Sequence, residues 1–425
     1  MRNILKLLIF CIVALLGCNE KEENYNRIKE GISQSLEEWL AKPFEEREPL
    51  ESLDFSIESL TKSQAENATT LFFQDRQATS LNEHGQQWND RVLNYNGHVM
   101  PFYYQIFGIK PPEGRSLFIS LHGGGGTTAA INDQQYENQK HLYDQAMNSL
   151  EGVYLAPRAP TNTWDLWHQN HIDDFLNIII QMAIAVENVN PNKVYLLGYS
   201  AGGDGVYQLA PRMADRWAAA SMMAGHPNDA SPLGLNNTPF AIHVGALDNA
   251  YDRNLKAQEW KSLLDDLENN TIGYYFHDVQ LHDGLGHWMD LQDAVALPWM
   301  KNYERNPIPQ KVVWKQDNRH HTSFYWIGIP EDLIETKGEI IAEYNTELNE
   351  INIISNYSNE IQLYINDKML NLDNPIIIKY QGEVISEKIF TRSILNIHET
   401  LSYKGDSELS FPCVLTVINN ENVEE

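Results

Sequence analysis

Between residues 89 and 305, short apolar runs alternate with longer stretches in which apolar residues recur at helical spacing. The apolar runs are nearly continuous, which is typical of strands that are buried on both faces of a parallel sheet. Strands are predicted over residues 117–121, 152–156, 193–197, 218–224, 239–244 and 272–276, and helices over 173–186, 202–213 and 255–267. This alternation predicts an α/β fold, with a mostly parallel sheet and helices on both of its faces.

The pattern differs before and after these elements. Residues 92–95 and 100–106 are predicted to pair as a hairpin through Asn96-Gly97, and residues 27–88 are polar with apolar residues near helical spacing. From residue 306 to 425, short runs alternate apolar and polar residues, as half-buried antiparallel strands do. We therefore predict a helical lead-in (27–88), an α/β domain (89–305) and a smaller all-β, sandwich-like domain (306–425).

The first residues have the form of an export signal. Arg2 and Lys6 precede an apolar stretch from Leu7 to Leu16, which is too short to span a bilayer but suits a secretory signal. The stretch ends in Gly17-Cys18, which resembles the lipobox of bacterial lipoproteins, in which the cysteine is lipidated after cleavage. The alternative is an ordinary signal peptide with a chance cysteine.

The lipobox resemblance implies a signal peptide over residues 1–17, lipid on Cys18 and an acidic tether over 18–26. The tether is similar to the acidic export tags of some lipoproteins of Gram-negative bacteria. We therefore expect a lipid-anchored protein of the outer membrane, surface-exposed or periplasmic, whose contact with the membrane is through its anchor alone.

Charge and cysteine content restrict the partners and the source of stability. The formal net charge is −27, and loss of Arg2 and Lys6 with the signal makes it −29, so binding to nucleic acid is not expected. The three cysteines are Cys11 in the signal, the predicted lipid site Cys18 and Cys413. A mature chain of this kind has no intrachain disulfide, so its stability must come from the burial of apolar side chains.

The stretch LLGYSAGGDG places Ser200 directly after a predicted strand and before a predicted helix. A serine on such a turn is exposed at the carboxyl end of the sheet, where it can act as a nucleophile, and the flanking Gly198 and Gly202 avoid clashes. The sequence His122-Gly123-Gly124-Gly125-Gly126 follows another predicted strand. The backbone N–H groups of Gly123, Gly124 and Ala201 are candidates for an oxyanion hole. A phosphate-binding loop would need Gly-Lys-Ser/Thr, which is absent here.

A serine nucleophile needs a base and a carboxylate that orients the base. Asp248 follows the strand predicted over 239–244 and is the preferred acid, with Asp252 as its rival. His287 lies in a later loop and is the preferred base, with His282 as the alternative. His243 lies inside a predicted strand, where a packed core histidine is expected.

Taken together, the glycine loop, Gly198-Tyr199-Ser200-Ala201-Gly202, Gly245-Ala246-Leu247-Asp248 and Gly286-His287-Trp288 resemble the α/β-hydrolase superfamily over residues 89–303. The most similar branch contains polyhydroxybutyrate depolymerases, feruloyl and acetylxylan esterases, and the phospholipase/carboxylesterase group. The resemblance implies a serine esterase with a Ser-His-Asp triad. Residues 363–379 and 382–384 resemble an accessory β-domain found on predicted bacterial hydrolases.

Aromatic and metal-binding residue types also occur near predicted strand ends. Trp164 and Trp167 could stack on a sugar or an aromatic acyl group, or pack a lid, and Tyr199 and Trp288 are further candidates for substrate contact. A second set invites a metal interpretation, but no complete ligand shell accompanies it, so no metal is predicted. This set comprises His168, His171, Asp173, Asp174, His320 and His321.

The prediction is therefore an enzyme without a cofactor, which cleaves a small-molecule or polymer-linked carboxylic ester in two acyl-transfer steps. One alternative is a serine peptidase of the prolyl-oligopeptidase type, although residues 27–88 are too short for the propeller that such enzymes carry. The other is a non-catalytic surface lipoprotein that binds glycan. The identity of the ester and the oligomeric state are left open by the sequence.

Overall fold

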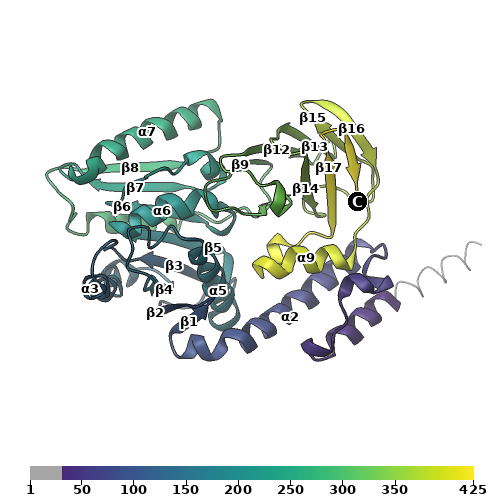
Figure 1. Ribbon diagram of the computed structural model, residues 1–425, viewed down its shortest axis with the longest axis horizontal. Helices are drawn as coiled ribbons and strands as arrows, with labels where there is room; N and C mark the ends of the chain where they lie inside the picture. Colours follow the sequence, from purple (N-terminus) through teal and green to yellow (C-terminus); the bar gives the residue numbers. More distant parts are fainter. Residues whose placement is uncertain (1–30) are drawn as a thin grey trace, which may run out of the picture.

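The computed structural model of the protein describes residues 31–425, and it divides visibly into an α/β part, a β-sandwich and a long helix that runs along both (Figure 1). The predicted signal peptide, Cys18 and the acidic tether lie outside the described residues. Within residues 31–425, no helix combines the length and the hydropathy that crossing a bilayer requires.

The α/β part is built on an eight-stranded sheet in the order β1-β2-β4-β3-β5-β6-β7-β8. Strands β4, β3, β5, β6, β7 and β8 are parallel, whereas β1 and β2 run antiparallel at one edge. The strands are β1 (Val92–Tyr95), β2 (His98–Phe107), β3 (Arg115–Leu121), β4 (Gly152–Pro157), β5 (Val189–Tyr199), β6 (Ala219–Met223), β7 (Phe240–Gly245) and β8 (His277–His282). The predicted α/β class is confirmed.

Helices cover both faces of this sheet, because its central strands are apolar on both sides. One face packs on α5 (Asn170–Glu187), α6 (Ala201–Arg212) and α7 (Arg253–Asn270) in one apolar cluster. The other face packs on α3 (Ala129–Gln139), α4 (Asp144–Met147) and α8 (Ala296–Met300) in a second cluster. The parallel strands thus end at one edge of the sheet, where loops can bring distant residues together.

The strand predicted over 272–276 is wrong. Ile272 is 93% exposed, and Gly273 and Tyr275 have φ angles of +92° and +56°. These left-handed conformations break an extended chain, so the apolar residues there form a turn, and β8 begins only at His277.

The N-terminal segment is helical only in part. Residues 31–40 form a helix, but residues 41–61 contain short 3-10 turns beside Pro43 and Pro49. The long helix α2 (Lys62–Asn89) begins at a capping box in which Thr61 and Gln64 bond each other's backbone. Its 28 residues extend about 42 Å at 1.5 Å per residue, which is enough to contact both halves of the molecule.

Two contacts show how α2 joins the halves. Arg76 donates to Gln181 Oε1 on α5 at 2.9 Å, and the ring of Phe72 lies 5.2 Å from that of His398 on α9 (Ile394–Lys404). The alternation in residues 306–425 did not predict α9, because it is a short helix between strands.

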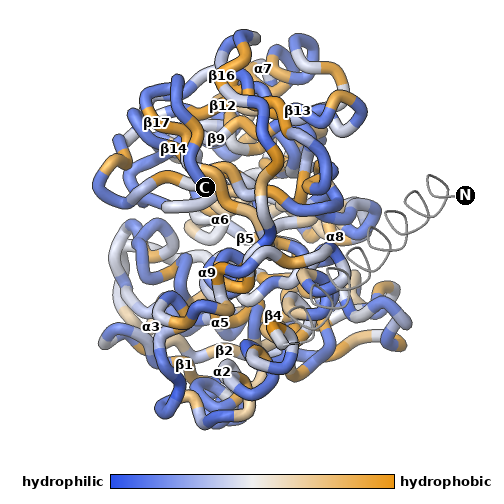
Figure 2. The backbone as a smooth tube through the Cα atoms, turned by 90° about the vertical axis from the view of Figure 1, so that its right-hand side faces the viewer, coloured by the Kyte–Doolittle hydropathy of each residue, from blue (hydrophilic) through white to orange (hydrophobic). Residues whose placement is uncertain are grey.

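The C-terminal part contains two five-stranded sheets packed over one apolar core, in the orders β10-β11-β14-β17-β18 and β16-β15-β13-β12-β9. Buried and part-exposed residues alternate along its strands, and apolar and polar stretches are interspersed over this part of the chain (Figure 2). The apolar run over residues 323–327 is not one strand, because Tyr325, with a φ of +53°, makes the turn between β10 and β11. The strands are β9 (Lys311–Lys315), β10 (Ser323–Phe324), β11 (Ile327–Gly328), β12 (Glu339–Asn345), β13 (Glu350–Ser355), β14 (Glu360–Ile365), β15 (Ile376–Tyr380), β16 (Glu383–Lys388), β17 (Cys413–Ile418) and β18 (Asn422–Glu424).

Buried ion pairs join the sandwich to the α/β part. Asp406 accepts from Arg305 Nη2 at 2.7 Å and lies 3.4 Å from Arg216 Nη1. All three side chains are almost fully buried, so separating the two parts would leave charges without partners. The two parts therefore fold against each other as one unit.

Candidate active site

Ser200 occupies the sharp turn between β5 and α6. Its φ of +59° and ψ of −120° are unusual for a residue with a side chain, and such strain is found mainly at functional sites. Two bonds hold the turn: Ser200 N–H donates to Met223 O at 2.9 Å, and Asp204 N–H donates to Ser200 O at 2.9 Å. The turn presents the hydroxyl at the carboxyl edge of the sheet.

The two glycines beside the turn are required by close backbone approach. A Cβ atom on Gly198 would lie 2.3 Å from Gly202 O, and one on Gly202 would lie 2.1 Å from Leu121 O at the end of β3. Backbone atoms cannot move aside as a flexible side chain can. The glycines of the motif are therefore explained by packing against β3 and against each other.

Gly202→Ala is expected to destabilise the protein by about 3 kcal/mol or more, because the added methyl group overlaps a backbone carbonyl. The matched control is Gly85→Ala in α2, where nothing lies within 4 Å of the new Cβ, and this variant should gain about 0.5 to 1 kcal/mol. Chemical denaturation of both variants measures the difference, and equal stabilities would contradict the assigned packing.

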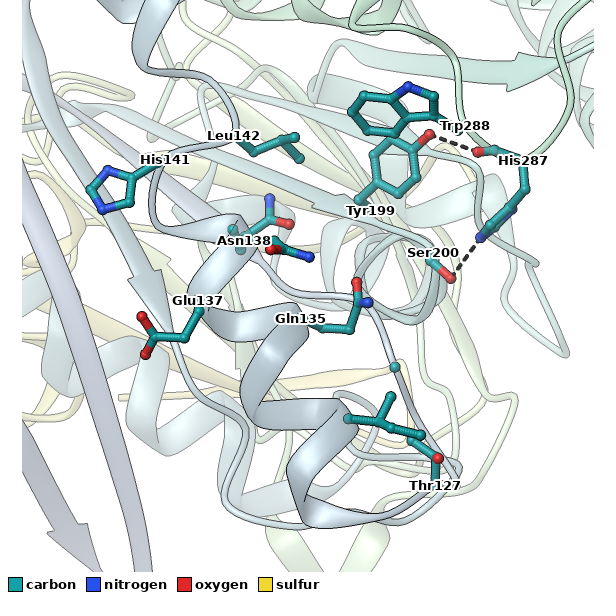
Figure 3. Close-up of a pocket in the computed structure, with 13 residues that line it drawn as sticks. Thr127, Gln135, Glu137, Asn138, His141, Leu142, Tyr199, Ser200, His287 and Trp288 are labelled. Atoms are coloured by element: carbon teal, nitrogen blue, oxygen red, sulfur yellow. Dashed lines mark hydrogen bonds between the residues drawn. The ribbon is translucent and has the colours of Figure 1, made fainter.

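Three side chains from three different loops form one hydrogen-bonded line. His287 Nε2 lies 3.0 Å from Ser200 Oγ, and His287 Nδ1 lies 2.7 Å from Asp248 Oδ2. Asp248 is buried just after β7, whereas the side chain of His287 is 44% exposed. The line therefore runs from a buried carboxylate to a hydroxyl that lines an open cavity, and Figure 3 shows its His287–Ser200 part.

Neighbouring groups fix the histidine loop and the carboxylate. A Cβ on Gly245 would lie 2.0 Å from Gly286 O, so this glycine allows the loop to cross the end of β7. Tyr199 OH donates to His287 O at 2.6 Å and accepts from Met289 N at 3.2 Å. Arg253 Nη1 lies 3.6 Å from Asp248 Oδ1, the carboxylate oxygen that does not face His287.

The structure separates the preferred residues from their rivals. Asp252 is exposed, with a φ of +56° at the start of α7. His282 ends β8, and its Nε2 lies 3.2 Å from His243 Nδ1. Burial lowers the pKa of His243 to about 3, as expected for a neutral core histidine. The structure thus brings Ser200, Asp248 and His287 together and leaves Asp252 and His282 out.

The glycine-rich loop after β3 passes directly over the serine turn. A Cβ on Gly123 would lie 3.2 Å from Ser200 Cβ, and one on Gly125 would lie 3.6 Å from Ala201 Cβ. Gly124 has a φ of +115°, and a Cβ there would lie only 2.0 Å from Asn132 Oδ1. The predicted oxyanion groups Gly123, Gly124 and Ala201 therefore lie together around Ser200.

Two residues that the sequence analysis did not single out for this purpose hold that loop. Asn132 on α3 accepts from Gly125 N–H at 3.0 Å and donates to Gly125 O at 3.1 Å. His122 Nδ1 donates to Gly123 O at 2.6 Å, while Nε2 accepts from Ala159 N at 3.1 Å. Burial lowers the pKa of His122 to about 4, so a neutral ring with this tautomer persists at neutral pH.

Asp204 also went unnoticed in the sequence, although it lies one helical turn after Ser200 on α6. Burial raises its pKa to about 6, and it accepts from His226 N–H at 2.6 Å. Its position in the helix, four residues after the nucleophile, was the signal that could have drawn attention to it.

The structure buries one of the two tryptophans predicted to contact substrate and leaves the other half exposed. Trp167 was a wrong prediction, because its ring is fully buried and its Nε1 donates to His122 O at 2.9 Å. Through this hydrogen bond, Trp167 supports the start of the glycine-rich loop. Trp164 is half exposed, with its ring 6.0 Å from that of Tyr251, and it does not line the cavity beside Ser200.

A cavity of about 930 Å³ opens beside Ser200 (Figure 3). The predicted contact residues Tyr199 and Trp288 form one wall, with ring centroids 5.9 Å apart, and α3 forms the opposite wall. Its lining comprises Gly124, Thr127, Ile131, Gln135, Glu137, Asn138, Gln139, His141, Leu142, Tyr199, Ser200, His287 and Trp288.

Several of the residues considered as metal ligands instead form ion pairs, ring contacts or hydrogen bonds within the protein. Asp173 lies between Arg212 Nη2 at 2.5 Å and His321 Nε2 at 2.8 Å, and the His171 ring stacks on that of His98 at 3.8 Å. His320 Nε2 lies 2.9 Å from Thr336 Oγ1. In the part of the chain that the structure describes, no three His, Cys, Asp or Glu side chains gather as a metal site would require.

One of these contacts belongs to the junction with the C-terminal part. Arg319 Nε donates to His168 O at 2.6 Å, next to the buried Trp167. The sandwich therefore contacts the same loop whose tryptophan supports the glycine-rich loop.

A parallel sheet flanked by helices on both faces carries a serine on the strand-to-helix turn after β5, with an acid and a histidine in later loops. The chain has an α/β-hydrolase-like fold. No family model matches the sequence.

Comparison with known proteins gives partial matches. The protein named "Putative esterase NocK" from Nocardia uniformis subsp. tsuyamanensis is 30% identical over 131 residues, which is 29% of this chain and 38% of that protein's length. Among solved structures, a thermostable esterase is 17% identical, with a TM-score of 0.40, over 51% of this chain and 64% of its own. The poly(3-hydroxybutyrate) depolymerase LpqC from Bordetella parapertussis is 15% identical, with a TM-score of 0.39, over 51% and 88%.

Proposed function

We propose that the protein is a serine hydrolase that cleaves carboxylic esters by two-step acyl transfer. The observation that carries the proposal is the hydrogen-bonded line Asp248–His287–Ser200 beneath the glycine-rich loop. The similarity over 131 residues to the protein named "Putative esterase NocK" supports the choice of ester chemistry. The signal-like start of the chain and Cys18 would place this activity at the cell envelope, anchored by lipid.

The geometry supports a defined proton path. Asp248 accepts the Nδ1 proton of His287, so Nε2 is left to accept the hydroxyl proton of Ser200. Ser200 Oγ then bonds to the carbonyl carbon, and the backbone N–H groups of Gly123, Gly124 and Ala201 stabilise the oxyanion. Nε2 returns its proton to the leaving alcohol, and water hydrolyses the acyl-serine through the same residues.

A panel of matched substrates tests the proposed function. The wild-type protein should hydrolyse short-chain 4-nitrophenyl esters and leave aminoacyl 4-nitroanilides nearly untouched. Turnover of the anilides alone would replace the esterase proposal by the peptidase alternative. A protein that hydrolyses neither class, and whose Ser200 does not react with a fluorophosphonate, would support the non-catalytic, glycan-binding alternative.

A further inference from the structure

The helix α3, which forms one wall of the active-site cavity, carries a row of three side-chain amides on one face. Asn132, Gln135 and Gln139 are spaced three and four residues apart, so they lie one above another on this helix. Asn132 holds Gly125 through two hydrogen bonds, and Gln139 Nε2 donates to Ser120 Oγ at 2.6 Å. The first and last amides of the row are therefore buried and bonded within the protein.

The middle amide of the row lines the cavity instead. Figure 3 shows the side chain of Gln135 extending from α3 on the side of the helix that faces Ser200. Within residues 31–425, this amide forms no hydrogen bond with another side chain or with the backbone. It therefore has a donor and an acceptor to offer to a molecule in the cavity.

The position of this amide relates it to the reacting atoms. A Cβ on Gly123 would lie 3.2 Å from Ser200 Cβ and 3.4 Å from Gln135 Oε1. The space beside Gly123 is thus bounded by the nucleophile on one side and by the amide on the other. Because Gly123 has no side chain, the carbonyl group of a substrate can occupy this space, where it lies within reach of Gln135.

The backbone around the same space has N–H groups that are not used by the protein. Gly125 N–H donates to Asn132, whereas the N–H groups of Gly123 and Gly124 form no hydrogen bond in the part of the chain that the structure describes. Rotation about the last side-chain bond of Gln135 exchanges Nε2 and Oε1, and no partner among the described residues opposes it. Gln135 can therefore add a side-chain donor to these two backbone donors.

We propose that Gln135 is a further catalytic residue, whose amide donates a hydrogen bond to the oxyanion that forms at the acyl carbon. This inference rests on the proposed function. When Ser200 Oγ bonds to the acyl carbon, its proton passes to His287 Nε2, and the π electron pair of the carbonyl moves onto the carbonyl oxygen. Gln135 Nε2–H stabilises this charge together with the backbone donors. When the electron pair returns, the bond from the carbon to the alcohol oxygen breaks, and that oxygen takes the proton from His287.

Two substitutions at one position, with a neighbour as control, test this role. Gln135→Leu should lower kcat for 4-nitrophenyl acetate about 10²-fold and leave KM within about threefold, because the lost hydrogen bond forms only as charge develops. Gln135→Glu keeps the shape of the side chain, but its carboxylate repels the oxyanion, so its loss of kcat should be at least as large. Gln134→Leu removes an exposed amide of α3 outside the cavity and should keep both constants within about twofold.

Inhibition by trifluoroacetone separates loss of a donor from disturbed packing. This ketone forms a tetrahedral adduct with a serine hydroxyl, and the adduct carries a negatively charged oxygen. Its inhibition constant should therefore rise in Gln135→Leu by about the same factor as kcat falls. A loss of kcat without weaker inhibition, or a change in KM alone, would overturn the role of Gln135.

Full activity of Gln135→Leu would also overturn it. In that case, Ser200-dependent hydrolysis of 4-nitrophenyl acetate by the wild-type protein would leave the proposed function intact. A wild-type protein that neither hydrolyses this ester nor is bound by trifluoroacetone would remove the proposed function, and the role of Gln135 with it.

Discussion

Ser200→Ala is expected to lower kcat for 4-nitrophenyl acetate by about 10⁶-fold, effectively to background. The variant lacks the oxygen that bonds to the acyl carbon, and His287 Nε2 loses the hydroxyl to which it is hydrogen-bonded. Stopped assays with purified wild type and variant at equal concentration measure the loss. A variant that retains a tenth of the wild-type rate would contradict the assignment of the nucleophile.

The structure offers a matched control for this loss. Ser221 lies on the neighbouring strand β6, and its buried hydroxyl has no hydrogen-bond partner in the described part of the chain. Ser221→Ala should keep full activity and wild-type stability or slightly more, because it removes a buried polar group without a partner. A loss in both variants would point to disturbed folding instead of lost chemistry.

Asp248→Asn is expected to lower kcat by about 10⁴-fold while KM changes little. The amide can donate to His287 Nδ1, which would favour the tautomer whose proton sits on Nε2 and removes the base that faces Ser200. The comparison of kcat and KM between variant and wild type measures the effect.

The rival carboxylate provides the control. Asp252 is exposed at the start of α7, so Asp252→Asn should keep kcat within about twofold of wild type. The opposite ranking, with Asp252→Asn the more damaging change, would reassign the acid.

Much of the α/β part could be predicted because its signals are local. The strand that ends at Tyr199 is visible as a run of apolar residues, and Asn96-Gly97 adopts the left-handed angles of a tight hairpin turn. The order of Ser200, Asp248 and His287 along the chain is likewise a property of the sequence. The sequence did not decide whether Asp248 or Asp252 orients His287, but the backbone geometry after β7 brings only Asp248 to the histidine.

The failures come from tertiary context. Ile272 and Phe276 are apolar but exposed, and left-handed φ angles at Gly273 and Tyr275 turn the chain where composition alone predicted a strand. Trp167 follows a strand end as Trp164 does, yet it packs behind the glycine-rich loop instead of lining the site. The contacts of Asn132 with the glycine-rich loop depend on how α3 packs against that loop, and the spacing of apolar residues does not encode this packing.

Covalent trapping identifies the nucleophile directly. The wild-type protein is treated with a fluorophosphonate and digested, and its peptides are sequenced by mass spectrometry. We expect a single phosphonylated residue, Ser200, with labelling abolished by Ser200→Ala and strongly slowed by His287→Ala. Labelling of a different residue, or no labelling of a folded protein that hydrolyses esters, would rule out Ser200 as the nucleophile.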